Sequence, residues 1–239
     1  MIFGCDIGIL AEPLLVIAYN GTGQGSLSSL LQTMSRLTII VAATKSNGIG
    51  QHGGLPWRLS KEMAYFARVT STAPEGRKNA VIMGRKTWES IPANFRPLSK
   101  RLNVVISHNE DYELTSSNPS TPVHLCSNLT LAVELASQAD IHRRFIIGGV
   151  SLISETLNPI SSSPTPCITD RVLLTRILAP DFPQCDVFIP DFLGASEEGE
   201  TEWKQATHDE LVQWTGFDVP AGVQEEKGVS YEFQMWLRQ

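Results

Sequence analysis

The residue best suited to acid–base chemistry in this sequence is Glu62. It falls in a stretch with helical spacing, residues 60–70, where it shares one face with Leu59, Met63 and Phe66. Burial among apolar neighbours raises the pKa of a carboxyl group, because burial disfavours the charged form, and so suits the group to proton transfer near neutral pH. The common alternative is a carboxylate at a helix edge that reaches solvent.

A second candidate site is basic. The run Gly84-Arg85-Lys86-Thr87 places two cations and a hydroxyl where a predicted strand turns into a helix. The first turn of a helix binds phosphate through its free amide groups and its dipole, and cations strengthen that binding. The sequence therefore indicates either a phosphate-binding turn or, as is more common for a basic turn alone, solvated surface.

A glycine-rich segment follows the first predicted strand. Gly48-Ile-Gly50-Gln-His-Gly53 matches the pattern G-x-G-x-x-G of dinucleotide-binding turns. That turn must open a helix, and the run Gly53-Gly54-Leu55-Pro56 breaks one; the acidic residue expected after the next strand is also absent. We interpret the segment as a flexible glycine loop or as a loop that closes over a bound ligand.

Short apolar runs alternate with helical patterns along the chain from residue 37 onward. This alternation predicts a single α/β domain with a central, twisted, mostly parallel sheet, helices on both faces, and ligands at the carboxyl ends of the strands. The last strand alternates apolar and polar residues, which is typical of an antiparallel edge strand. The predicted strands are 37–43, 79–84, 101–107, 144–148, 171–177 and 229–237, the helices 60–70, 86–90, 129–137 and 151–157, and the surface loops 108–122, 158–169 and 194–202.

Composition excludes several classes of partner. The net charge of −6 and a pI of about 5.4 argue against nucleic acid or an anionic membrane as the main partner. The four cysteines are scattered, so neither a disulfide framework nor a zinc site follows from their spacing, and no metal is expected. No run of 18 apolar residues occurs, and the N-terminus lacks the basic residues of a signal peptide or presequence. We expect a cytoplasmic protein.

The first 33 residues differ from the rest. Residues 19–33 are rich in Gly and Ser, and no periodic pattern before them is long enough for a core element. We expect residues 1–33 to be an N-terminal extension that is disordered or non-essential, and residues 34–239 to form the domain.

Blocks of residues in a fixed order resemble the dihydrofolate reductase family, and they cover 35–239 with loop insertions. The block Gln224-Glu-Glu-Lys-Gly228 and the long loops indicate the eukaryotic branch and are compatible with a fungal source. The other blocks are Gly48-Ile-Gly50, Leu55-Pro56-Trp57 with Glu62 and Phe66, Val81-Ile-Met-Gly-Arg-Lys-Thr-Trp88, Ser90-Ile-Pro92, Arg96-Pro-Leu98 with Arg101, Ile147-Gly-Gly149 and Leu174-Thr-Arg-Ile177.

This resemblance implies a monomeric enzyme that reduces 7,8-dihydrofolate to 5,6,7,8-tetrahydrofolate with NADPH, and so supplies folate cofactors for one-carbon metabolism and thymidylate synthesis. Glu62, backed by Thr175, is expected to bind the pterin and to assist protonation through a water near Trp57. Arg101 is expected to pair with the α-carboxylate of the glutamate tail. The apolar walls around the pterin and aminobenzoyl rings are expected to be Ile40, Met63, Phe66, Ile91 and Leu98.

The resemblance also implies a set of cofactor residues. Lys86 and Thr87 are assigned to the pyrophosphate, Arg85, Ser107 and His108 to the adenosine 2′-phosphate. Gly148-Gly149, joined by a cis peptide in the family, is assigned to the nicotinamide. The remaining expected cofactor residues are Ala42, Gly48, Ile49, Gly50, Gly53, Gly84, Val150, Ser151 and Leu152.

Some positions depart from the family's pattern. Gly54 stands where Asp or Asn is usual, Ile153 where a Tyr touches the substrate pocket, and Val187 where Thr is common. His108 replaces an Arg, so that charge there depends on pH. These departures motivate one alternative, a folate- or NADPH-binding protein with impaired catalysis. A second is a riboflavin-pathway reductase of the same fold, which is expected to lack the Leu-Pro-Trp and Glu62 pairing.

Overall fold

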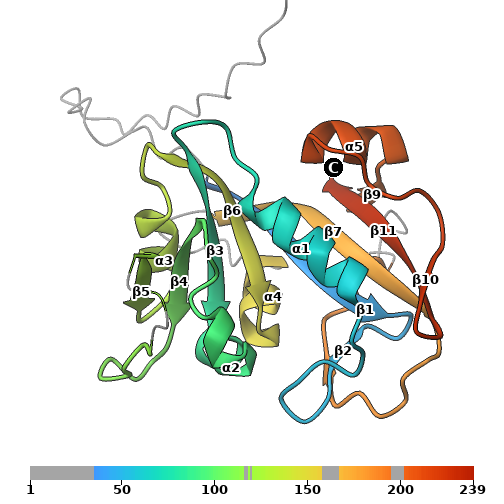
Figure 1. The fold of residues 1–239 in the computed structure, drawn as a ribbon, viewed down its shortest axis with the longest axis horizontal. Coiled ribbons are helices and arrows are strands. Elements are labelled where there is room, and N and C mark those ends of the chain that lie inside the picture. Colours follow the sequence, from blue (N-terminus) through green and yellow to red (C-terminus); the bar gives the residue numbers. More distant parts are fainter. Residues whose placement is uncertain (1–34, 116–117, 119, 158–166, 195–201) are drawn as a thin grey trace, which may run out of the picture. The chain divides into compact units, whose positions relative to one another are not determined.

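The computed structural model describes residues 35–115, 118, 120–157, 167–194 and 202–239 (Figure 1). The predicted strands and helices between 37 and 237 are all present, with ends that differ by a few residues. The strands are β1 (Ser35–Thr44), β2 (Gly48–Gly50), β3 (Lys78–Gly84), β4 (Arg101–Ile106), β5 (Val123–Cys126), β6 (Ile141–Gly148), β7 (Cys167–Ala179), β8 (Val187–Phe188), β9 (Trp203–Gln205), β10 (Gln224–Glu226) and β11 (Val229–Arg238). The helices are α1 (Ser60–Ser71), α2 (Arg85–Ser90), α3 (Leu129–Leu135), α4 (Val150–Leu157) and α5 (His208–Thr215), with a 3-10 turn at Ala93–Phe95.

The main sheet has the order β10-β11-β7-β1-β6-β3-β4-β5, and β9 also pairs with β11. The pairs from β7 to β5 are parallel, whereas β11 runs antiparallel to β7. The prediction of a mostly parallel sheet with an antiparallel end is therefore confirmed. That end comprises three strands, because β9 and β10 both pair with the outer side of β11.

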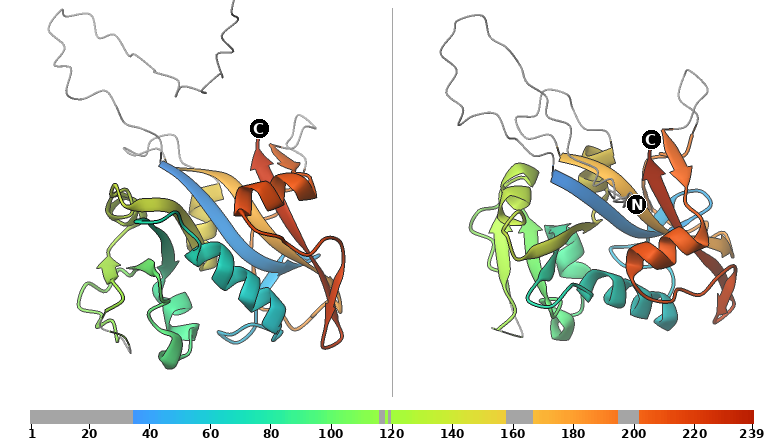
Figure 2. Two further views of the ribbon diagram at one scale, coloured as in Figure 1. Left: turned by 45° about the horizontal axis from the view of Figure 1, so that its top comes forward. Right: turned by 90° about the horizontal axis from the view of Figure 1, so that it is seen from above.

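Alternation along the buried strands directs side chains to two apolar cores. In β3, Ala80 and Ile82 pack with α3 and α4, whereas Val81 and Met83 pack with α1, α2 and α5. The helices thus cover both faces of a twisted sheet, as the alternating pattern predicted (Figure 2). This arrangement brings α1 across one face, with its first turn beside the carboxyl ends of β1 and β7.

Several elements differ from the sequence-based prediction. The strands β2, β5, β8, β9 and β10 and helix α5 were not predicted, and β7 begins at Cys167, inside the predicted loop 158–169. Helix α5 carries local signals: Thr207 and Glu210 form a capping box, and Gly216 ends the helix in the left-handed conformation at φ 75°. The prediction for residues 1–33 lies outside the described residues and stays a prediction.

Two further observations concern membranes and metals. In the part of the chain that the structure describes, no helix is both long and apolar enough to cross a membrane. Over the same residues, no three His, Cys, Asp or Glu side chains gather in a way that would hold a metal ion.

Candidate active site

Glu62 lies in the first turn of α1, with its side chain turned into the protein. The residue is 7% exposed, and the Thr175 hydroxyl of β7 donates a hydrogen bond to Glu62 Oε1 at 3.3 Å. Burial raises the pKa of Glu62 to about 7; the Thr175 hydrogen bond lowers it, and the nearby charge of Glu226 raises it further. A carboxyl group with this pKa is half protonated near neutral pH, which suits it to exchange a proton with a ligand.

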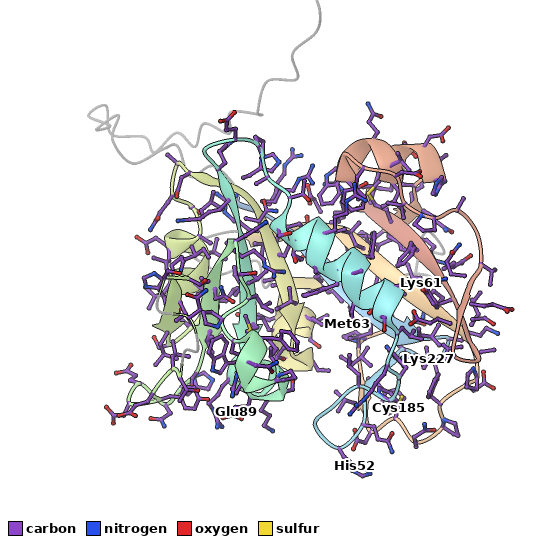
Figure 3. The ribbon with its side chains drawn as sticks, in the orientation of Figure 1. His52, Lys61, Met63, Glu89, Cys185 and Lys227 are labelled. Carbon is purple, nitrogen blue, oxygen red and sulfur yellow. The ribbon has the colours of Figure 1, made fainter. Side chains whose placement is uncertain are left out.

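The neighbours of Glu62 on α1 differ in part from the prediction. Tyr65 and Val69 are buried with it, and Phe66 is half-buried, as expected for one helix face. Met63 is 47% exposed and therefore lies outside the apolar core, and its predicted role as a substrate contact stays a prediction. Figure 3 labels Met63 beside α1. A residue next to Glu62 is turned by about 100° around the helix axis, and this rotation takes Met63 out of the core.

Three buried polar groups close to this carboxyl have no hydrogen-bond partner within the described residues. They are the indole Nε1 of Trp57 and the hydroxyls of Tyr65 and Tyr231. Burial and the charge of Glu62 raise the pKa of Tyr65, and burial, Glu226 and Glu62 raise that of Tyr231. Buried donors of this kind normally bind a protein group, a water or a ligand. Trp57 is among the site residues predicted from the sequence, whereas neither tyrosine is, although Tyr65 stands three positions after Glu62.

Trp57 is buried in an apolar cluster. It is 4% exposed and packs edge-on against Phe182, with ring centroids 5.2 Å apart. Leu59, Cys185 and Tyr231 belong to the same apolar cluster. This cluster joins the start of α1 to the loop after β7 and to β11, so three distant segments fix the indole.

The glycine segment forms a short two-stranded sheet and opens no helix. Gly48 and Gly50 of β2 pair with Phe188 and Val187 of β8. A Cβ on Gly48 would lie 2.8 Å from both Cβ and Sγ of Cys185, which explains why only glycine fits there. The match to a dinucleotide-binding turn is therefore coincidental, as the sequence analysis concluded.

The turn of this loop runs from Gln51 to Gly54, which exchange two backbone hydrogen bonds of 2.9 Å. His52 and Gly53 between them have φ of 49° and 77°. Gly54 itself has an ordinary φ, and a Cβ there would be 3.8 Å from the Gln51 carbonyl oxygen. The backbone could thus accept Asp or Asn at position 54.

On the other side of β1, the ends of β3 and β6 bring four of the predicted cofactor residues together. A Cβ on Gly148 would lie 3.0 Å from Thr87 Oγ1, and one on Gly84 would lie 3.7 Å from the Gly149 nitrogen. Gly148 has a φ of 133°, and the Gly148–Gly149 peptide is cis, as the resemblance implied. The backbones at the starts of α2 and α4 therefore approach each other closely, which leaves a cradle that side chains at the two glycines would fill.

The charged residues of this region are partly engaged. Arg85 Nη1 forms an ion pair with Glu89 Oε1 at 2.9 Å, and its guanidinium lies over the Tyr112 ring at 5.6 Å. Ser107 is buried at the end of β4, whereas Lys86 and His108 are exposed. Among the other predicted cofactor residues, Leu152 of α4 is buried in the core that α3 and α4 cover, and Ala42, Ile49 and Val150 are half-buried.

Arg101 begins β4 beneath the C-terminal end of α1. It is 6% exposed, its Nε donates to the Ser99 carbonyl at 2.9 Å, and Nη1 donates to the Thr70 hydroxyl. Burial lowers its pKa to about 10. No acidic side chain among the described residues pairs with it. A buried guanidinium without a carboxylate is well suited to bind one from a ligand.

Four of the residues predicted to form the substrate walls lie on the same face of the sheet. Ile40 is buried, and Phe66, Ile91 and Leu98 are half-buried against the core that α1 and α2 cover. Ile153, one of the departures from the family pattern, is 1% exposed on α4 and packs in the opposite core. Its side chain therefore serves the packing of the domain.

Comparison with known proteins identifies the family. The family model described as dihydrofolate reductase matches residues 36–215. The chain belongs to the dihydrofolate reductase family. It is 43% identical to the dihydrofolate reductase of Cryptococcus neoformans over 218 residues, which cover 84% of this chain and 94% of that protein. The enzyme of Pneumocystis carinii is 41% identical over 213 residues, covering 84% of this chain and 96% of the relative.

The fold agrees with the sequence relationship. The solved structure of Schistosoma mansoni dihydrofolate reductase superposes with a TM-score of 0.65 at 32% identity, over 87% of this chain and all of that chain. Fungal and animal relatives of this similarity confirm the eukaryotic type that the sequence blocks indicated. They do not favour the two alternatives, a riboflavin-pathway reductase or a binding protein with impaired catalysis.

Proposed function

We propose that this protein reduces 7,8-dihydrofolate to 5,6,7,8-tetrahydrofolate with NADPH as the reductant. The observation that carries the proposal is the buried Glu62 carboxyl, hydrogen-bonded to Thr175 and with a pKa near 7. This is the group that acid-assisted reduction of a pterin double bond needs. Membership of the dihydrofolate reductase family gives the substrate class.

Glu62 acts on the pterin in two ways. As a carboxylate it accepts hydrogen bonds from the amino group and ring nitrogen of the pterin, while Thr175 holds one of its oxygens. As the protonated acid it supplies a proton for the ring nitrogen beside the carbon that is reduced. The buried Nε1 of Trp57 has no partner among the described residues and is available to orient a water on this path.

The remainder of dihydrofolate fits the residues between α1 and β4. Ile40, Phe66, Ile91 and Leu98 supply apolar contacts for the two ring systems, and Met63 is free to close over them because it is exposed. Arg101 offers its planar guanidinium to the α-carboxylate of the glutamate tail. The ligand would thereby neutralise a buried charge that has no acidic partner in the described protein.

NADPH fits the cradle at the carboxyl ends of β3 and β6. When bound, it supplies the hydride. The backbones at Gly84 and Gly148–Gly149 approach each other without intervening side chains, and the resemblance assigns the nicotinamide to this glycine pair. Lys86 and Thr87 are assigned to the pyrophosphate, Arg85, Ser107 and His108 to the 2′-phosphate. The other predicted contacts come from β1, the glycine loop and α4, at Ala42, Gly48, Ile49, Gly50, Gly53, Val150, Ser151 and Leu152.

The proposal is tested by following NADPH oxidation with and without dihydrofolate. Oxidation that depends on dihydrofolate and yields tetrahydrofolate is expected. Tight binding of both ligands without turnover would instead favour an inactive binding protein, and turnover of a riboflavin-pathway pyrimidine alone would favour the other alternative. We further propose that the enzyme acts as a cytoplasmic monomer that supplies folate cofactors for one-carbon metabolism and thymidylate synthesis.

Cofactor choice should depend on Arg85 and His108. Substitution of both by Ala is expected to lower the preference for NADPH over NADH by about 10-fold or more, because a charged hydrogen bond to the 2′-phosphate contributes about 1.5–3 kcal/mol. The ratio of kcat/KM for the two cofactors measures the effect. Arg36→Ala serves as the matched control. Arg36 lies at the start of β1, away from the carboxyl ends of the strands where the cofactor is proposed to bind, and its side chain is 82% exposed. An unaltered ratio in the double variant would place the 2′-phosphate elsewhere.

Arg101→Lys tests recognition of the glutamate tail. We expect the KM for dihydrofolate to rise by about 10- to 100-fold, because an ammonium cannot replace a bidentate fork. The KM for a dihydropterin that lacks the glutamate should change little, and the comparison of the two substrates measures tail recognition directly. An equal rise for both substrates would mean that Arg101 only supports the structure through Thr70 and Ser99.

A further inference from the structure

Helix α1 begins without a cap of its own. The N-cap residue is Leu59, whose side chain cannot accept a hydrogen bond, so the first amides of the helix need another partner. Glu226 of β10 provides it. Its Oε1 accepts from the Ser60 amide at 2.6 Å, and its Oε2 accepts from the Lys61 amide at 2.9 Å. A carboxylate at this place is also favoured by the helix dipole.

A tight hairpin holds Glu226 in place. Glu226 pairs with Val229, and the two residues of the turn, Lys227 and Gly228, have φ of 52° and 76°, as in a type I′ turn. Lys227 Nζ donates to the carbonyl of Arg58 at 3.2 Å, which ties the hairpin to the segment before α1. Lys61 and Lys227 are labelled on these two neighbouring segments in Figure 3.

The hairpin is anchored on its inner side as well. Val229 and Tyr231 of β11 are buried in the same cluster as Trp57 and Leu59. The first turn of α1 is therefore clamped by apolar contacts and by the two hydrogen bonds to Glu226. Glu62 is the next residue after Lys61, so the position of its carboxyl group depends on this clamp.

The carboxylate of Glu226 also contributes a negative charge near Glu62. The polar and charged groups that face Glu62 are Thr175 from β7, Tyr65 on its own helix, Tyr231 from β11, and Glu226 from β10. Hydrogen bonds from the backbone of Lys61 lower the pKa of Glu226, so it is charged when Glu62 titrates. Lys227 faces Glu226, and no cation of the described residues forms an ion pair with either carboxylate.

We propose that Glu226 is a positioning residue for Glu62: its carboxylate fixes the first turn of α1 and places a second negative charge beside the catalytic carboxyl. Repulsion between the two charges favours the protonated form of Glu62, which is the form that serves reduction. Glu226 thus acts through Glu62 and contacts no reacting atom. This inference rests on the proposed function for its kinetic consequence, but not for its effect on the titration of Glu62.

The proposal is tested with Glu226→Gln, Glu226→Asp and the matched control Glu225→Gln. Glu225 is the preceding residue of β10, is exposed, and is not among the groups that shift the pKa of Glu62. The titration of Glu62 is read in the ligand-free protein by carbon-13 NMR of labelled glutamate carboxyls, with the resonance assigned through its loss in Glu62→Gln. The pH profile of kcat/KM with dihydrofolate is measured for the same variants.

In Glu226→Gln the titration midpoint of the Glu62 carboxyl should move to lower pH. The pH at which kcat/KM declines should move in the same direction. The rate at pH 8 should drop by about threefold while the rate at pH 6 stays near that of the parent. Gln keeps one oxygen that can accept a hydrogen bond from the first turn of α1, so the main change is in the protonated fraction of Glu62. Glu226→Asp, which keeps the charge, should restore the midpoint. Glu225→Gln should change neither quantity.

Two results would overturn the proposal. One is a midpoint for Glu62 that is the same in Glu226→Gln as in the parent protein, which would leave Glu226 as an ordinary helix cap. The other is an equal shift in Glu225→Gln, which would show a general effect of net charge. If the parent protein does not turn over dihydrofolate, the proposed function fails, whereas the NMR titration still decides the role of Glu226.

Discussion

Replacing Glu62 by Gln is expected to lower turnover of dihydrofolate by about 100-fold or more at pH 7, as for the loss of a positioned acid. Gln keeps the size of the side chain and can still accept the hydrogen bond from Thr175. It cannot release a proton. The fold and the affinity for NADPH should therefore be retained, and the loss should fall on kcat.

The pH dependence gives this prediction a second test. With a pKa of about 7 for Glu62, the rate of the parent enzyme should decline as pH rises above 7, because the protonated fraction decreases. The pH–rate profile of Glu62→Gln should lack a titration midpoint near pH 7. The difference in rate between the variant and the parent should become smaller at low pH, where solvent can supply the proton. Glu134→Gln, on the exposed side of α3, is the matched control. A variant with the parent's rate at pH 7 would remove Glu62 from the mechanism.

The same substitution should make the ligand-free protein more stable above neutral pH. The pKa of Glu62 is about 4.5 when the group is exposed and about 7 in the folded protein. Between these values the folded state binds more protons than the unfolded state, so the free energy of unfolding falls as pH rises from 4.5 to 7. Gln carries no charge at any pH, so the free energy of unfolding of the variant does not decrease through this ionisation.

At pH 8 the variant should therefore exceed the parent in free energy of unfolding by up to about 3 kcal/mol, since one pKa unit corresponds to about 1.4 kcal/mol. At pH 4.5 the two proteins should differ little. Urea unfolding at both pH values measures the difference, with Glu134→Gln again as control. Equal stabilities at pH 8 would indicate that the buried carboxylate is solvated in the native state, contrary to its 7% exposure.

The sequence predicted the central elements because their patterns are local. The strands β1, β3, β4, β6 and β7 each contain a short apolar run, and such runs bounded by turn residues are typical of buried parallel strands. The strand β5, residues 123–126, is only four residues long and follows a polar loop, so its pattern is too short to recognise. The capping box of α5 at Thr207 and Glu210 is a local sequence signal from which the start of this helix could be predicted.

The sequence motifs predicted which residues form the candidate site, but they did not predict how those residues contact one another. The resemblance gave Glu62, Trp57, Thr175 and Arg101, whereas the exposure of Met63 and the buried hydroxyls of Tyr65 and Tyr231 emerge only from packing. Glu226 is 166 residues from the amide that it caps at Ser60. No local pattern records such a contact, because it depends on how β10 and β11 close against the start of α1.

The position of β1 in the sheet has a consequence for the way the chain is made. Its two neighbours are β6 and β7, which are residues 141–148 and 167–179. During synthesis the apolar run Leu37 to Ala43 leaves the ribosome long before either partner strand exists, and the cap of α1 at Glu226 arrives later still. Contacts this distant in sequence slow folding and prolong the exposure of unpaired strands. The growing chain therefore exposes the unpaired edges of β1 until β6 and β7 have been synthesised.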